Sequence, residues 1–361
     1  MPASKPRHPR VTQKEVATAA GVSQMTVSYA LRGSELINPE TRKVVMQAAE
    51  QLGYRPNSSA VAIRQGRAGS VAIIESTTRY RSSFFGGALF DGSESVLAEH
   101  DIHIHVARIP DAALTDEGFI PKILREYTAD GLLINYIADI PDKLVELIDR
   151  YHIPATWINS KHPHNCVYLD DYAGGREATR YLIGLGHTRV AYVDYQNQPP
   201  DRADPSQQSV HYSIPERRQG YLDEMASAGL EPTLLYDETR EREHNPVAGR
   251  HFSRQWLAEP SRPSAIVSFN GRGAMQVIQA ATELGMSVPR DLSIVAFEDV
   301  PVFDNGFAVT VMRHNFEALG GAASRMLLRR LEDLPDCPDQ APEVRPFELV
   351  VGETTAPPRS K

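Results

Sequence analysis

The spacing of apolar residues changes near residue 70. Before that point they recur every three or four positions, and from Val71 they gather in short continuous runs separated by amphipathic stretches. The first spacing predicts helices, and the second predicts parallel strands buried on both faces and alternating with helices. We therefore expect a small all-α domain followed by an α/β core of two doubly wound parallel-sheet subdomains.

The stretch from Val11 to Gly33 predicts two short helices joined by a tight turn. Thr12 and Glu15 have the spacing of a capping box at the start of the first helix. Gly21 suits the left-handed residue that ends this helix, and Ser23 can cap the second. This pattern is typical of a helix-turn-helix, which lays its second helix in the DNA major groove. The alternative is an ordinary helical hairpin, but caps, turn and spacing all favour the DNA-binding unit.

A third helix should complete the core of this head. Asn38 and Pro39 supply its start signal, and Gly53 its end. Small residues at Ala17, Ala20 and Gly21 should let the first two helices cross closely. The predicted inner faces of the three helices carry Val16, Ala17, Ala20, Val27, Leu31, Val45, Ala48, Ala49 and Leu52.

The segment after the head predicts a hinge. Pro56 blocks continuation of the third helix, and Asn57 can cap a short helix over SSAVAIR. So short a helix needs a partner surface to be stable. Gly66, Gly69 and Ser70 then form a linker.

The rest of the chain alternates strands with helices. Strands are expected in SVAII, HIHVA, GLLIN, PATWI, RVAYV, AIVSF and LSIVAF, and helices at 87–99, 120–127, 141–151 and 174–185. Ligands of such sheets sit at the carboxyl ends of the strands. Residues 195–215 are polar and predict a long loop, either disordered or a flap over a cleft.

Charge separates the head from the core. Residues 1–67 hold ten Lys and Arg and four Asp and Glu, a net charge of +6, whereas the remainder holds 28 basic and 42 acidic residues, a net charge of −14. A basic head on an acidic body suggests that only the head meets a polyanion, although a solvated basic tail is the alternative. Two cysteines, no apolar leader and no spanning stretch predict a cytoplasmic protein without a membrane partner.

The sequence marks of common enzymes are missing. There is no G-x-x-x-x-G-K-[ST], G-x-S-x-G or H-E-x-x-H. Residues 161–166 offer several metal-capable side chains, but no fourth ligand lies nearby. We expect no enzyme activity, no cofactor and no metal site.

Many motifs of the chain resemble those of LacI/GalR-type transcriptional regulators. The head matches V-T-x-x-[DE]-V-A-x-x-A-G-V-S-x-x-T-V-S-x-x-L and continues to LGYRPN, and the core carries DGLLIN, DDYAGGREAT, LGHTRVAYV, RRQGY, VPRDLSIVAFED and ELVVGET. The resemblance implies a homodimer that binds a two-fold-related operator and a periplasmic-binding-protein-like core that encloses a small effector.

The resemblance also implies domain limits. The head would span 1–56, the hinge helix and linker 57–68, the core 69–355 and a tail 356–361. Within the core, where the chain crosses between subdomains three times, subdomain one would hold about 69–170 and 315–343. Subdomain two would hold about 171–312 and 344–355.

Candidate DNA contacts follow from the head and hinge. Gln24, Met25 and Tyr29 face outward early in the second helix, where base edges are read. Phosphate contacts are expected from Ser23, Thr26, Ser28 and Arg32, and Thr12 is a further DNA-binding candidate. In the hinge, Asn57 begins the helix, Ala60 and Ile63 would face the minor groove, and Ile63 would wedge between base pairs. Packing of Ile63 on the core is the alternative.

Candidate effector contacts come from four segments. Arg217 falls in the family's R-x-x-G, Asn270 and Glu298 end successive strands, and Phe84 could stack on a ring. Such a set suits a sugar- or nucleoside-like ligand, although a salt bridge or a core contact is an alternative for each residue.

Several positions depart from the family pattern. Tyr29 and Val61 stand where family members often have Arg, Ile63 replaces the usual Leu, Asn270-Gly271 replaces N-D, and Glu298 replaces the usual Asp. Operator and effector therefore cannot be copied from a known member. Two other classes remain to be weighed: an enzyme with a fused DNA-binding head, such as a sugar kinase, and a sugar-binding transport protein. The first lacks a phosphate-binding glycine loop, and the second is disfavoured by the head.

Overall fold

The computed structural model describes residues 11–56, 66–76, 86–109, 120–136, 140–195, 211–236, 246–299, 308–332 and 338–359. The chain divides into two compact units, Met1–Ala68 and Gly69–Lys361. Of the predicted site residues, Asn57, Ala60, Ile63 and Phe84 lie outside the described residues, as does most of the predicted loop 195–215. Among the described helices, none is long and apolar enough to cross a membrane.

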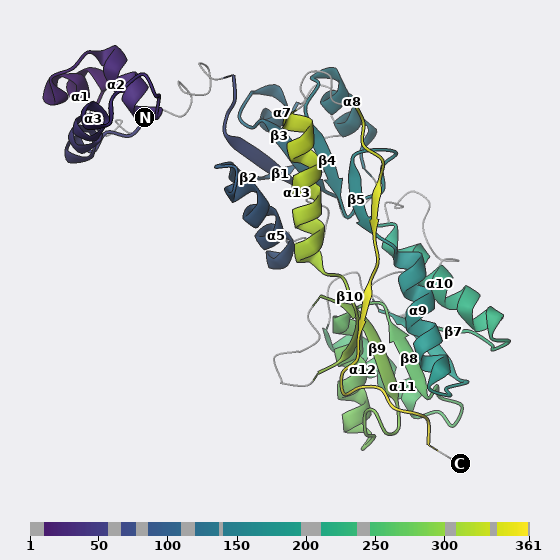
Figure 1. The fold of residues 1–361 in the computed structure, drawn as a ribbon. Coiled ribbons are helices and arrows are strands. Elements are labelled where there is room, and N and C mark those ends of the chain that lie inside the picture. The colour runs from purple at the N-terminus through teal and green to yellow at the C-terminus, as the bar shows by residue number, and fades with distance from the viewer. Residues whose placement is uncertain are drawn as a thin grey trace, which may run out of the picture. The chain divides into compact units, whose positions relative to one another are not determined.

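The described part of unit one contains three helices, α1 (Gln13–Ala20), α2 (Gln24–Leu31) and α3 (Pro39–Leu52) (Figure 1). Each begins as its sequence predicts. The Thr12 hydroxyl and the Glu15 carboxylate form a reciprocal capping box. The side chains of Ser23 and Asn38 accept hydrogen bonds from the amides of Thr26 and Thr41, at 3.0 and 2.7 Å. These caps satisfy amides that the helices leave without an internal partner.

The head core differs from its prediction at two positions. Gly21 has φ 66°, but a Cβ there would meet no atom within 4 Å. The glycine is therefore required for its left-handed backbone and not for close helix crossing. Leu52 is 39% exposed, because it lies in the last turn of α3 beyond the reach of the other helices. The buried core consists of Val16, Ala17, Val27, Ala30, Val45, Ala48 and Ala49.

Unit two contains two six-stranded sheets. The first, sheet A, has the order β11-β5-β4-β3-β1-β2 and is parallel throughout. Its strands are β1 (Ser70–Ser76), β2 (His103–Ile109), β3 (Gly131–Asn135), β4 (Ala155–Ile158), β5 (Cys166–Leu169) and β11 (Glu343–Arg345). Its helices are α5 (Gly87–Ala98), α7 (Lys122–Arg125), α8 (Asp142–Arg150) and α13 (Phe316–Glu332), of which α5 and α13 lie side by side (Figure 1).

The second, sheet B, has the order β12-β10-β9-β8-β6-β7, and only β12 is antiparallel to its neighbour. Its strands are β6 (Val190–Asp194), β7 (Thr233–Tyr236), β8 (Ala265–Ser268), β9 (Ser293–Glu298), β10 (Thr310–Arg313) and β12 (Glu348–Val350). Its helices are α9 (Asp171–Gly184), α10 (Ser213–Ser227), α11 (Pro246–Leu257) and α12 (Gly271–Glu283).

The chain passes between the two sheets at three places. β5 of sheet A is followed by α9, β10 of sheet B by α13, and β11 of sheet A by β12 of sheet B. We call the three connections, residues 170–171, 314–315 and 346–347, the crossovers. Strand β11 keeps the chain in sheet A as far as Arg345, two residues beyond the predicted limit of subdomain one at 343.

Candidate functional site

Helix α2 presents the predicted base-reading side chains outward. Gln24 and Met25 are exposed, Met25 with 67% of its surface accessible, and Tyr29 is half-buried. Val27 and Ala30, on the opposite side of α2, are buried in the head core. The exposed face thus begins at the helix N-terminus, the part of a recognition helix that contacts base edges.

Arg32 and Tyr29 are coupled on this face. The Arg32 Nε donates a hydrogen bond to the Ser28 carbonyl at 2.9 Å, and its guanidinium carbon lies 5.0 Å from the centre of the Tyr29 ring. Arg32 is therefore folded back along the helix. Its guanidinium plane thus lies beside the Tyr29 ring, in a cation–π contact.

The small hydroxyl residues of the predicted DNA face already hold the helix ends. The Ser23 hydroxyl caps α2 and lies 2.8 Å from the Thr26 hydroxyl. The Thr12 hydroxyl donates to a Glu15 carboxylate oxygen at 2.8 Å. Ser23 and Thr12 are exposed, so each keeps a face toward solvent beside its structural bond.

Arg217, on α10, is buried with only 6% of its surface exposed. Its Nε donates to Asp171 Oδ1 at 2.5 Å, its Nη1 to the Phe269 carbonyl at 2.9 Å, and its Nη2 lies 3.0 Å from His314 Nε2. The guanidinium also lies 4.3 Å from the centre of the Phe297 ring. The predicted effector residue is therefore already engaged by the protein, and a ligand would have to use its remaining N–H groups or replace a partner.

The partners of Arg217 have strongly perturbed acidities. Burial raises the pKa of Asp171, and the ion pair with Arg217 opposes that shift. Burial lowers the pKa of His314 well below its ordinary value, so this imidazole is neutral. Because a guanidinium only donates, His314 Nε2 must accept, and the proton sits on Nδ1. Neither His314 Nδ1 nor Asp171 Oδ2 has a hydrogen-bond partner among the described residues.

Asn270 and Glu298 follow β8 and end β9, at the carboxyl edge of sheet B. The Asn270 side-chain oxygen caps α12 by accepting from the Gly273 amide at 2.9 Å. Glu298 is half-buried, and burial raises the pKa of its carboxyl. Its Oε1 accepts from the Asp299 amide at 3.0 Å. The positive charge of Arg217 also acts on Glu298 and partly opposes the effect of burial, because it lowers the pKa of the Glu298 carboxyl.

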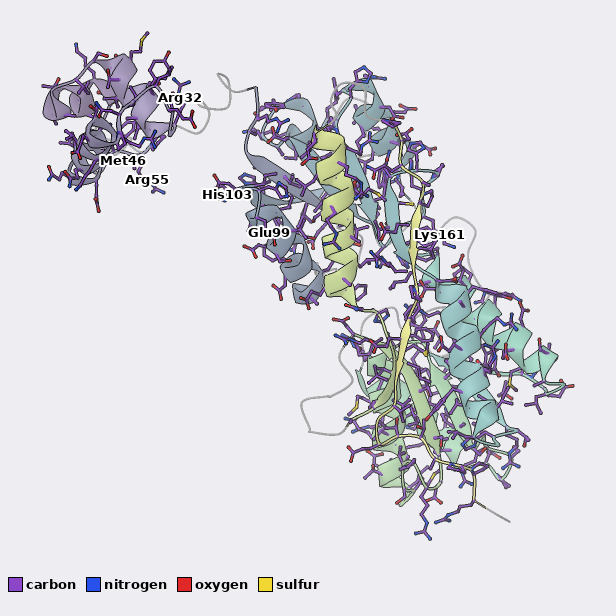
Figure 2. All side chains as sticks on the ribbon, in the orientation of Figure 1. Arg32, Met46, Arg55, Glu99, His103 and Lys161 are labelled. Carbon is purple, nitrogen blue, oxygen red and sulfur yellow. The ribbon has the colours of Figure 1, made fainter. Side chains whose placement is uncertain are left out.

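A cavity of about 540 Å³ lies at the carboxyl edge of sheet A. Residues after β3 and β4 line it together with α8 and the start of α10: Tyr136, Ile140, Asp142, Val145, Glu146, Ser160, Lys161, His162, His211 and Tyr212. Of the predicted effector residues that the structure describes, Arg217, Asn270 and Glu298, none lines it. Lys161 forms an ion pair with Glu216 in the first turn of α10, one residue before Arg217 (Figure 2).

Sequence reasoning missed several of these residues. His211 and Tyr212 lay within a stretch read as a loop, yet both are firmly placed. His211 Nε2 lies 2.6 Å from the Asn159 carbonyl, and burial lowers its pKa to about 4. Tyr212 accepts from the Leu169 amide at 3.2 Å. Their signal was weak, because nothing in the local sequence shows that α10 begins beside the end of β4.

The metal-capable segment 161–166 has structural contacts. His162 stacks on Trp157 with ring centres 5.0 Å apart, and the Cys166 thiol donates to the His162 carbonyl at 3.0 Å. The Asn165 side chain donates to Asp339 at 2.7 Å. Within the described ranges, no three His, Cys, Asp or Glu side chains are grouped so as to hold a metal ion.

Comparison with known families identifies both units. Residues 12–57 match the family described as bacterial regulatory proteins, lacI family, and residues 179–355 match the periplasmic binding protein-like domain. The HTH-type transcriptional regulator AglR of Rhizobium meliloti (strain 1021) is 28% identical over 358 residues, covering 96% of this chain and 95% of the relative.

Solved structures share the fold. The crystal structure of the Lac repressor dimer bound to operator and the anti-inducer ONPF has a TM-score of 0.76 at 21% identity, over 96% of this chain and 100% of that one. A complex of the transcriptional regulator CelR with cellobiose has a TM-score of 0.62 at 23% identity, with the same coverage. The relatives are DNA-binding transcriptional regulators of the LacI family and not enzymes, and this chain combines a lacI-family helix-turn-helix head with a periplasmic-binding-protein-like core.

Proposed function

We propose that the protein is a cytoplasmic, homodimeric repressor whose affinity for operator DNA is switched by a small polyhydroxylated ligand. One observation carries this proposal. Helix α2 exposes its predicted base-contacting side chains in one compact unit, and sheets A and B of the second unit place polar side chains at their carboxyl edges. The head is taken as 1–56, the hinge as 57–68 and the core as 69–355. The dimer bound to operator in the Lac repressor structure supports the same assembly here.

On the DNA side, three residues of α2 would set the operator sequence. Gln24 suits adenine, Met25 a thymine methyl group, and Tyr29 a single hydrogen bond. Thr12, Ser23, Thr26, Ser28 and Arg32 would bind phosphates, and Asn57, Ala60 and Ile63 would form the hinge at the minor groove. The net charge of +6 on residues 1–67 makes this binding dependent on salt.

On the ligand side, Arg217, Asn270 and Glu298 offer guanidinium donors, an amide donor and a carboxylate acceptor. Phe84 would add a stacking surface. Hydroxyl groups of a sugar are both donors and acceptors, so they satisfy this mixture of groups. The cellobiose bound to CelR supports a carbohydrate-like ligand for the same fold. The ligand changes DNA affinity only by favouring one core arrangement over another.

The test begins with a thermal-shift screen of metabolites on the full-length protein, followed by operator titration with and without each hit. Glu298→Gln keeps the size of the side chain and removes its charge, so it should abolish the ligand response while operator binding without ligand survives. Arg217→Ala should also abolish the ligand response. Arg218→Ala, on the neighbouring position of α10, is the control and should respond like the wild type. Wild-type ligand affinity in both Glu298→Gln and Arg217→Ala would remove these residues from the site.

A further inference from the structure

Each of the three crossovers brings one residue to the guanidinium of Arg217. Asp171, at the first crossover, pairs with Nε at 2.5 Å. His314, at the second, lies 3.0 Å from Nη2. The ring of Phe347, at the third, has its centre 5.6 Å from Arg217 Cζ. Arg217 itself comes from none of the crossovers, since it lies in α10 of the sheet B half.

Two glycines of α9 make this convergence sterically possible. A Cβ on Gly175 would lie 2.2 Å from the Arg217 carbonyl, so only glycine lets α10 approach this closely. A Cβ on Gly174 would lie 2.7 Å from Phe347 Cδ2. The first crossover is also joined to the strand before the third, because the Asp170 amide donates to the Arg345 carbonyl at 2.9 Å.

The crossover residues also contact one another around Arg217. His314 and Phe347 have ring centres 5.4 Å apart, and Phe347 packs edge-to-face on Phe297 at 5.1 Å. Asp171 is fully buried, and Phe347 is 7% exposed. A charge pair at such depth cannot exchange its partner for water at low cost. The guanidinium therefore contacts one buried residue from each of the three connections.

We propose that Arg217 is a positioning residue that sets the relative arrangement of the two halves of the core, with Asp171, His314 and Phe347 as its three crossover partners. A movement of one half against the other must bend the three crossovers together, and so must move or break their contacts with Arg217. A ligand that draws Arg217 away from any partner thereby changes the hinge. That last step rests on the proposed function, whereas the positioning role needs no ligand.

The experiment measures the distance between the two halves in full-length protein without ligand. Spin labels are placed on cysteines introduced at Tyr151, after α8, and Leu284, after α12, which are 44% and 37% exposed. Cys337 is replaced by Ser, and Cys166 is buried. Arg217→Lys keeps the charge but loses the planar fork, and Phe347→Leu removes only the ring. Arg218→Lys is the control.

We expect a broadened or shifted distance distribution in Arg217→Lys and in Phe347→Leu, and the wild-type distribution in Arg218→Lys. Wild-type distributions in both Arg217→Lys and Phe347→Leu would overturn the proposal. The outcome is independent of the effector: a changed distribution upholds the positioning role even if no metabolite shifts the melting temperature of the wild type. Failure of the metabolite screen bears on the proposed function alone.

Discussion

Replacing Val45 by Ala should destabilise the head selectively. Val45 is fully buried in α3, and the described core around it consists of three valines and four alanines. With so few large side chains, each valine supplies a large share of the apolar contact that holds the three helices together. A domain of this size has only a few kcal/mol of stability to lose.

The expected cost follows from what the substitution removes. Two buried methyl groups contribute about 0.8 kcal/mol each through burial. The cavity left behind adds about 1 kcal/mol. Alanine favours the helix by about 0.5 kcal/mol, which offsets part of the loss. The net destabilisation should be about 2 kcal/mol, or roughly a 30-fold rise in the unfolded fraction of the head.

Val44 provides the matched control. It is the preceding residue on the same helix and is 46% exposed. Val44→Ala loses only about half of the burial free energy that Val45→Ala loses, and it gains the same helix preference. Its net effect on the stability of the head should therefore be close to zero.

Hydrogen exchange of peptides from residues 11–56, measured in the full-length protein, reports on the head directly. The slowest head amides should exchange about 30-fold faster in Val45→Ala and at wild-type rates in Val44→Ala. Both tryptophans, Trp157 and Trp256, lie in unit two, so tryptophan fluorescence should show an unchanged core in both variants. Equal exchange rates in the two variants would refute the assignment of Val45 to the head core.

Four further outcomes are expected. Tyr29→Arg should shift the preferred base at one half-site position by about 1–3 kcal/mol, and identical sites selected from random DNA by both proteins would contradict this. Ile63→Ala should weaken operator binding more than binding to random DNA, as titration of both would show, because only the specific complex includes the wedge. Gly175→Ala should destabilise unit two in urea unfolding by about 1–3 kcal/mol, whereas Gly184→Ala, where a Cβ meets no atom within 4 Å, should not. Burial lowers the pKa of His211 from 6.5 to about 4, so between these pH values the unfolded chain binds more protons than the folded one. The free energy of unfolding should therefore fall as pH drops from about 6.5 to about 4. His211→Gln should reduce this pH dependence, as urea unfolding at a series of pH values would show.

The helix signals of the sequence act over a few residues, and this explains which predictions were confirmed. The caps at Thr12, Ser23 and Asn38 are found where their spacing placed them. Strands with continuous apolar runs, such as β3 and β9, are fully or almost fully buried. Strands β5, β7, β10, β11 and β12 were not predicted, because each is only three or four residues long and too short to show a clear apolar pattern.

Helix α9 begins three residues before the predicted start at Gly174. The Asp170 side chain caps it by accepting from the Ala173 amide at 2.9 Å. Gly174 and Gly175 lie inside the helix at positions where Phe347 and α10 leave no room for a Cβ. The environment of Arg217 could not be predicted for the same reason: its partners are 46 and 97 residues away in sequence, and only the fold brings them together.

The interleaving of the two sheets has a consequence for how the protein is made. Sheet A includes β11, and its helix α13 buries residues such as Leu319 and Leu327, so it cannot be completed until residue 345 has left the ribosome. Sheet B waits for β12, which ends at Val350. All three helices of the head, by contrast, are available once residue 52 has been made.

A nascent chain therefore displays a finished head while both halves of the core are incomplete. For most of translation the reading helix α2 is already folded, but the binding-protein core that would regulate it is not. A chain interrupted before residue 343 would lack an edge strand in both sheets and would expose their unpaired edges to other chains. Both sheets are thus completed only once residues 343–350 have been made.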